Sequence, residues 1–134
     1  MKTTLRILIA LVMTAIGLSH FVSPDPFVRI VPHFLPWPLA LVYISGACEI
    51  AGGIGLLPRR TRKLASWGLI ALYLAVFPAN INMAIHNIQL SEGGQIPVWA
   101  MWARLPMQAL FIALVWWLGR SHIHSEGLSG EKGE

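Results

Sequence analysis

A glutamate lies in the middle of the uncharged, apolar and glycine-rich stretch VYISGACEIAGGIGLL, residues 42–57. A carboxylate in an apolar segment of membrane length usually faces the protein interior or water and has a partner there. Such a group can exchange a proton or accept hydrogen bonds from a ligand. Small residues lie one turn before and one turn after Glu49: Ser45, Gly46, Gly52 and Gly53. Because small residues let another helix approach closely, we expect the Glu49 carboxylate to point into a helical bundle.

Six further polar side chains lie within or at the ends of apolar segments and are candidates for the same site: His20, Asn80, Asn82, His86, Arg104 and Gln108. Arg104 is the only basic residue deep inside such a segment. At about 1.5 Å per residue, Glu49 lies roughly 16 Å and Arg104 roughly 9 Å from the outer ends of their helices. We therefore expect Arg104 to pair with Glu49, and Gln108, one turn further on, to satisfy a remaining lone pair. A ligand or proton site and a purely structural role in fixing helix register both remain open.

The elements that must position these groups are four long apolar segments. The 134 residues are 55% hydrophobic and only 12% charged, about half the charge of an average soluble chain. The segments cover residues 5–22, 38–57, 64–86 and 98–119, each close to the ~20 residues that span a bilayer. The sequence predicts an all-α protein, an integral membrane four-helix antiparallel bundle in residues 1–120. Residues 121–134 carry too little apolar surface to pack and are expected to form a disordered cytoplasmic tail.

Basic residues predict the orientation of the bundle. They flank the first segment, fill the second connection and close the fourth segment: Lys2, Arg6, Arg59, Arg60, Arg62, Lys63 and Arg120. By the positive-inside tendency, both termini face the cytoplasm. The N-terminal stretch has features of a secretory signal peptide, but its apolar run continues through His20, so we expect it to remain as the first helix. A juxtamembrane basic cluster without a recognisable binding motif argues against nucleic acid as a partner and for contact with the lipid bilayer.

The side chains that bind metals and carry redox chemistry are sparse. Cys48 is the only cysteine, which excludes an intramolecular disulfide and a dithiol redox centre. No helix carries metal-ligand spacing, so no metal site is predicted. Haem is disfavoured because the sequence singles out no axial histidine or methionine.

Several segments together resemble the DoxX-like family of small bacterial integral membrane proteins. They are Gly17, His20 and Phe21, the proline-rich VPHFLPWP, VYISGACEIAGGIGLL, the basic turn, the segment AxWGLIALYLAVFPANINMAIH from Ala65 to His86, and Arg104, Pro106 and Gln108. The resemblance runs from about Gly17 to Leu118. It implies a multi-pass protein of the bacterial plasma (inner) membrane in a redox-associated group, whose relatives include subunits of thiosulfate:quinone oxidoreductase. The single Cys48 departs from the relatives that use a dithiol.

These observations favour an accessory protein or subunit of quinone-linked redox metabolism, with a polar site in the outer half of the bundle. Quinone is the cofactor or ligand class that this reading implies, and a redox partner protein and a homo-oligomer are both compatible with it. The alternative is a membrane scaffold that positions a partner enzyme without a ligand of its own. A small-solute or proton transporter is a weaker reading, because four helices without visible inverted repeats offer little machinery for alternating access. Whether the chain is an enzyme is not decided by its sequence.

Overall fold

The computed structural model describes residues 1–90, 93 and 95–120. The described residues form helices and connections, with no strand. The elements are α1 (Lys2–Val22), α2 (Asp25–Ile30), α3 (Pro38–Gly55), α4 (Arg62–His86) and α5 (Val98–Gly119). The four long helices match the predicted segments to within three residues at every end, and the predicted tail at 121–134 lies outside the described residues.

Four of the helices, α1, α3, α4 and α5, are long and apolar enough to cross a membrane. Their outward faces carry large apolar side chains, among them Leu11, Ile44, Leu74 and Leu110, which are 60–70% exposed. Exposing so many apolar side chains to water is unfavourable, whereas the acyl chains of a bilayer solvate them well. The structure therefore indicates a multi-pass membrane protein.

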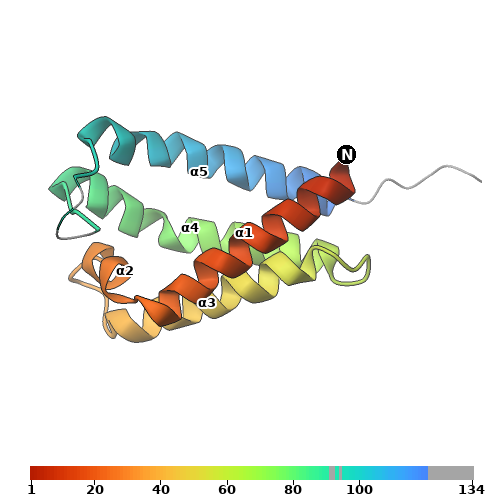
Figure 1. Ribbon diagram of the computed structural model, residues 1–134, viewed down its shortest axis with the longest axis horizontal. Helices are drawn as coiled ribbons and strands as arrows, with labels where there is room; N and C mark the ends of the chain where they lie inside the picture. The colour runs from red at the N-terminus through yellow and green to blue at the C-terminus, as the bar shows by residue number, and fades with distance from the viewer. Residues whose placement is uncertain (91–92, 94, 121–134) are drawn as a thin grey trace, which may run out of the picture.

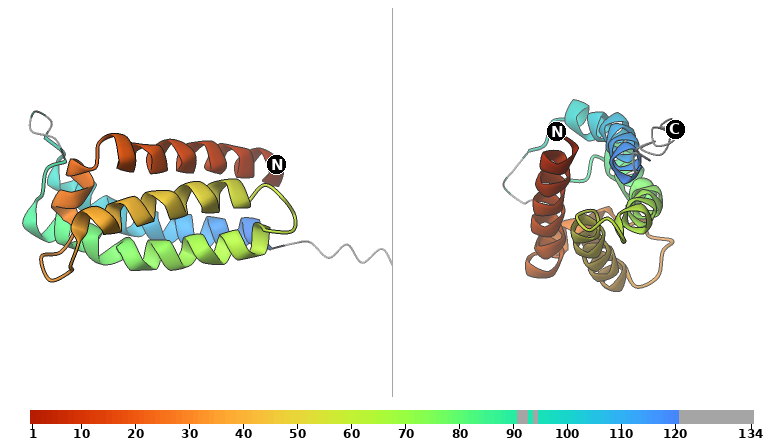
Figure 2. Two further views of the ribbon diagram at one scale, coloured as in Figure 1. Left: turned by 90° about the horizontal axis from the view of Figure 1, so that it is seen from below. Right: turned by 90° about the vertical axis from the view of Figure 1, so that its right-hand side faces the viewer.

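The long helices form a bundle in which each packs on its neighbours in a set order. α3 lies between α1 and α4, and α5 packs on the other side of α4. The N-terminus, the turn between α3 and α4 and the end of α5 lie together at one end of the bundle (Figures 1 and 2). α2 and the connection from α4 to α5 lie at the other end. Figure 1 shows α1 and α5 spreading apart toward the α2 end.

Two apolar clusters form the core, one toward each end. The larger lies nearer the N-terminal end and is built from α1, α4, α5 and the residue that follows α3: Ile9, Met13, Leu56, Leu69, Ile70, Val115 and Leu118. The smaller lies toward the α2 end: Ile30, Met83, Ala84 and Met101. Three buried polar side chains that belong to neither cluster, His20, Glu49 and Gln108, take part in the candidate site.

The connection between α1 and α3 is rich in proline. The sequence excludes an ordinary helix through its whole length, and only the six residues of α2 are helical, with proline in the first turn. Asn82 of α4 fastens the end of α2, because its Nδ2 donates to the carbonyl oxygen of Ile30 at 3.1 Å. α2 is thereby held against the bundle end.

Arginine side chains cap helix ends at the end of the bundle that holds the N-terminus. Arg6 is buried, and its Nε and Nη2 donate to the carbonyl oxygen of Leu118 at 3.1 and 2.8 Å, which ties α1 to the last turn of α5. Arg62 donates in the same way to the carbonyl oxygens of Leu56 and Leu57 at the end of α3. Carbonyl groups in the last turn of a helix have no partner within the helix, so these side chains satisfy groups that would otherwise be orphaned.

Candidate polar site between α1, α3 and α4

The Glu49 carboxyl group is buried between three helices. The residue is 8% exposed. Its Oε1 accepts a hydrogen bond from the hydroxyl of Tyr73 on α4 at 3.3 Å. Its Oε2 lies 3.5 Å from His20 Nδ1 on α1 but has no hydrogen-bond partner among the described residues. One oxygen of this carboxyl group therefore stays unsatisfied, which is unusual for a buried polar atom.

His20 is held in one orientation by contacts on two sides. Its Nδ1 hydrogen-bonds the carbonyl oxygen of Ile16 at 2.8 Å, and because a carbonyl only accepts, Nδ1 carries a proton. The ring stacks on Phe27 of α2, with centroids 3.9 Å apart. Since the Nδ1 proton is directed at Ile16, it is not available to complete a hydrogen bond with Glu49 Oε2.

Glycines on α1 and α3 bring His20 and Glu49 together. A Cβ atom at Gly46 would lie 2.7 Å from His20 Cβ and 2.9 Å from the carbonyl oxygen of Gly17. A Cβ atom at Gly53 would lie 2.7 Å from Met13 Cβ. These separations are too short for real side chains, so α1 can lie this close to α3 only because the residues are glycines. The predicted close approach along the small-residue face of Glu49 is confirmed.

Tyr73 extends the site toward α5. Its hydroxyl lies 3.1 Å from Met13 Sδ as well as near Glu49, and its main-chain carbonyl accepts a hydrogen bond from Gln108 Nε2. Gln108 in turn accepts a hydrogen bond from Asn80 Nδ2 at 2.6 Å. Polar contacts thus run from α1 through α3 and α4 to α5. Such a chain can fix the helices in register and can also hold a protonatable group in a defined place.

The expected ion pair between Glu49 and Arg104 does not form. Glu49 contacts His20 and Tyr73, and the hydrogen bond of the Arg104 guanidinium goes to Met83 Sδ, with a distance of 3.6 Å from Nη1. The cause is the packing order, since α4 lies between α3 and α5. Gln108 likewise bonds Asn80 and the Tyr73 carbonyl, and does not satisfy Glu49 as expected.

The remaining candidates lie outside the His20–Glu49–Tyr73 cluster. Asn82 secures α2, and the exposed His86 bonds only the carbonyl oxygen of Asn82, through Nδ1 at 3.1 Å. Cys48, next to Glu49 in the sequence, is exposed on the outer face of α3. In the described part of the chain, no three His, Cys, Asp or Glu residues gather where they could hold a metal ion.

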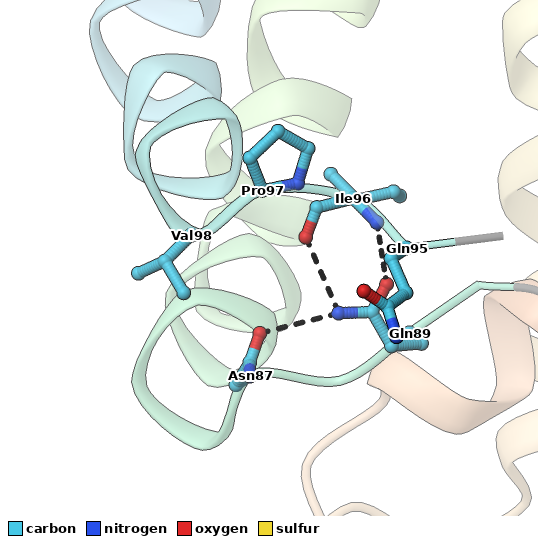
Figure 3. A pocket seen from close by; sticks show the side chains of 6 residues that line it. All are labelled: Asn87, Gln89, Gln95, Ile96, Pro97 and Val98. Carbon is cyan, nitrogen blue, oxygen red and sulfur yellow. Dashed lines mark hydrogen bonds between the residues drawn. The ribbon is translucent and has the colours of Figure 1, made fainter.

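A surface pocket lies at the α2 end, between the end of α4 and the start of α5 (Figure 3). It is lined by Asn87, Gln89, Gln95, Ile96, Pro97 and Val98. The Gln89 amide bonds the Asn87 side chain and both main-chain groups of Ile96. The amide is therefore used to hold the connection together, and the pocket is separate from the buried polar cluster.

Tyr73 is the site residue that was not among the sequence candidates. A tyrosine in a membrane protein usually marks the interface, whereas Tyr73 lies at the twelfth position of a 25-residue helix. It shares a helix face with Asn80, seven residues on, and the shared face was visible in the sequence. A tyrosine in the middle of a membrane-spanning helix, on the same helix face as an asparagine, was the sequence feature that could have identified it.

Comparison with known proteins gives a match to a family model. No curated protein and no solved structure matches the chain. The model of a domain of unknown function, DUF8561, matches residues 9–119, which include most of α1, the whole of α3, α4 and α5, and every residue of the polar cluster. That description carries no activity, so the likeness to the DoxX-like family stays a prediction. Because the match covers most of its length, the chain belongs to the DUF8561 family.

Proposed function

We propose that this protein is an accessory protein or subunit of quinone-linked redox metabolism in the bacterial inner membrane, related to the DoxX-like proteins. The cluster of His20, Glu49 and Tyr73 is its site for the polar head of a quinone. The electron transfer belongs to a partner enzyme, and this chain contributes hydrogen bonds and a proton-exchanging carboxyl group.

One observation carries the proposal: Glu49 Oε2 is buried and has no hydrogen-bond partner among the described residues. Leaving a buried polar atom unsatisfied costs about 1–3 kcal/mol, so a ligand atom that bonds Oε2 gains that free energy on binding. Tyr73 and His20 flank the same carboxyl group and restrict the positions from which a ligand atom can approach.

The two protonation states of a carboxyl group match the two redox states of a quinone. A carboxylate accepts a hydrogen bond from a hydroquinone hydroxyl, and a neutral carboxylic acid donates one to a quinone carbonyl. Glu49 can therefore bind the hydroquinone as a carboxylate and the quinone as a neutral acid, and the two states of Glu49 differ by one proton. The exposed apolar faces of the helices suit the isoprenoid tail, which partitions into the acyl chains.

The sidedness that we propose follows from the distribution of charge. The N-terminus and the turn between α3 and α4 share one end of the bundle, and that turn and the start of α4 expose Arg59, Arg60 and Lys63. The positive-inside tendency assigns this end to the cytoplasm, with the long helices alternating in direction. α2 and the His20 ring stacked on it then lie toward the outer side, and Glu49 and Tyr73 lie near the middle of their helices.

Titration of the purified protein with a menaquinone analogue tests the head-group site. We expect saturable quenching of tryptophan fluorescence for the wild type, and an affinity lower by about tenfold for Glu49→Met, which removes the hydrogen bond and keeps the volume. Cys48→Ala changes the neighbouring residue on the outer face of α3 and is expected to leave the affinity unchanged. Absence of saturable binding to the wild type, or equal affinities for all three proteins, contradicts the proposal.

A scaffold without a ligand is the second candidate. The contacts from His20 to Asn80 connect all four long helices, as a purely structural network would. The exposed cations of the turn between α3 and α4 offer a surface for an acidic partner protein. A wild-type protein that binds no quinone favours this second role.

A further inference from the structure

Arg104 is a cation exposed within a helix that is otherwise apolar enough to cross a membrane. It lies on the same stripe of α5 as Met101 and Gln108, which are 1% and 6% exposed, yet Arg104 itself is exposed. This part of α5 is where α1 has spread away from it (Figure 1). The guanidinium therefore belongs to the inward stripe of α5 without being covered by another helix.

The guanidinium has little to satisfy it within the described residues. Of its five N–H donors, one makes a long contact to the thioether of Met83, which is a weak acceptor. Glu49, the only acidic residue in the four long helices, is engaged by His20 and Tyr73 instead. A charged group at this depth is costly unless an anion or a set of acceptors meets it.

We propose that Arg104 binds the phosphate of an anionic phospholipid from the leaflet at the α2 end. Arg104 lies about 9 Å along α5 from Val98, a depth from which a long arginine side chain reaches toward the head-group level. Guanidinium and phosphate match in geometry as well as charge, because two parallel N–H groups can bond two phosphate oxygens.

Neighbouring side chains suit a lipid with a hydroxylated head group. His86 lies one turn beyond Met83 on α4 and is exposed, and its Nδ1 donates to the Asn82 carbonyl, so in the neutral ring Nε2 is left as an acceptor. A phosphatidylglycerol hydroxyl can donate to that nitrogen. Met107 and Leu110, exposed by 64% and 70% on α5, offer apolar surface for acyl chains. One phospholipid thereby satisfies the cation and covers apolar surface at once.

Native mass spectrometry of the detergent-purified full chain with added phosphatidylglycerol tests this site. We expect one tightly retained lipid on the wild type, with affinity reduced on the order of tenfold in Arg104→Gln. Arg59→Gln removes the same charge from the exposed turn at the opposite end and is expected to change the affinity less than twofold. Should Arg104→Gln fail to fold, Arg104→Lys, which keeps the charge but loses the paired donors, is expected to show an intermediate affinity.

Three results would overturn the proposal. Equal lipid retention by Arg104→Gln and Arg59→Gln would show that only net charge matters. Inorganic phosphate that displaces phosphatidylglycerol from the wild type at millimolar concentration would make the site one for a soluble anion. Conversion of a wild-type dimer to a monomer by Arg104→Gln, with lipid retention unchanged, would show that a second copy of the chain covers the guanidinium.

Discussion

Gly46→Leu is expected to lower the stability of the protein in detergent by about 3 kcal/mol or more and to abolish quinone binding. A Cβ atom at this position already lies 2.7 Å from His20 Cβ and 2.9 Å from the Gly17 carbonyl oxygen, before the rest of a leucine side chain is added. Neither contact can relax cheaply, because one is at the root of a side chain and the other is main chain. α1 must move away from α3, and His20 moves with it. Thermal unfolding followed by circular dichroism and titration with the menaquinone analogue measure the two effects.

Gly68→Leu is the matched control for this substitution. Gly68 lies in α4 and is exposed, and apart from its chain neighbours and the backbone of its own helix no heavy atom lies within 4 Å of the position that a Cβ atom would take. Leucine also has the higher helix propensity, so we expect unchanged or slightly raised stability and normal binding. If the two substitutions lower the unfolding temperature equally, the close packing of α1 on α3 through glycine is refuted.

Arg6→Met is expected to cost about 2–3 kcal/mol of stability, the second largest effect. Arg6 Nε and Nη2 both donate to the Leu118 carbonyl oxygen, and the residue is 7% exposed, so methionine keeps much of the volume while leaving that carbonyl without this partner. The bond joins the first long helix to the last at the end where they meet. Its loss should therefore increase proteolysis of the last turns of α5 as well as lower the unfolding temperature.

Arg120→Met provides the comparison for Arg6. Arg120 is exposed and lies over the ring of Trp116, a contact worth about 0.5–1 kcal/mol at an exposed site. We expect a small change in unfolding temperature and no change in proteolysis. A loss of stability in Arg120→Met as large as that in Arg6→Met would mean that positive charge at this end, rather than the capping of α5, is what stabilises the bundle.

Helix positions and one helix face could be predicted from the sequence. Continuous apolar segments of membrane length gave the four long helices, because their length and hydrophobicity are properties of each segment alone. The small residues around Glu49 likewise belong to one helix, and their spacing places them on a single face. The burial of Glu49 could be predicted because small residues surround it on that face.

The partner of Glu49 could not be predicted, because it depends on which helices are neighbours. Depth along a helix can be counted from a sequence, but the order of four helices around a bundle axis cannot. Opposite charge favoured Arg104, whereas α4 separates α3 from α5 and the contacts go to the uncharged Tyr73 and to His20. The sequence likewise indicated only that Arg6 marks the cytoplasmic end. Its hydrogen bond to the Leu118 carbonyl oxygen could not be predicted, because it depends on α5 lying beside α1 at that end.

Infrared difference spectroscopy of the Glu49 carboxyl group tests the central claim most directly. The claim is that this carboxyl group, enclosed by His20 and Tyr73, bonds the head of a quinone. Adding the menaquinone analogue to the wild type should shift a carboxyl stretching band, and that band should be missing from the same experiment on Glu49→Gln. A wild-type spectrum that the analogue leaves unchanged, or a shift that persists in Glu49→Gln, would contradict the claim.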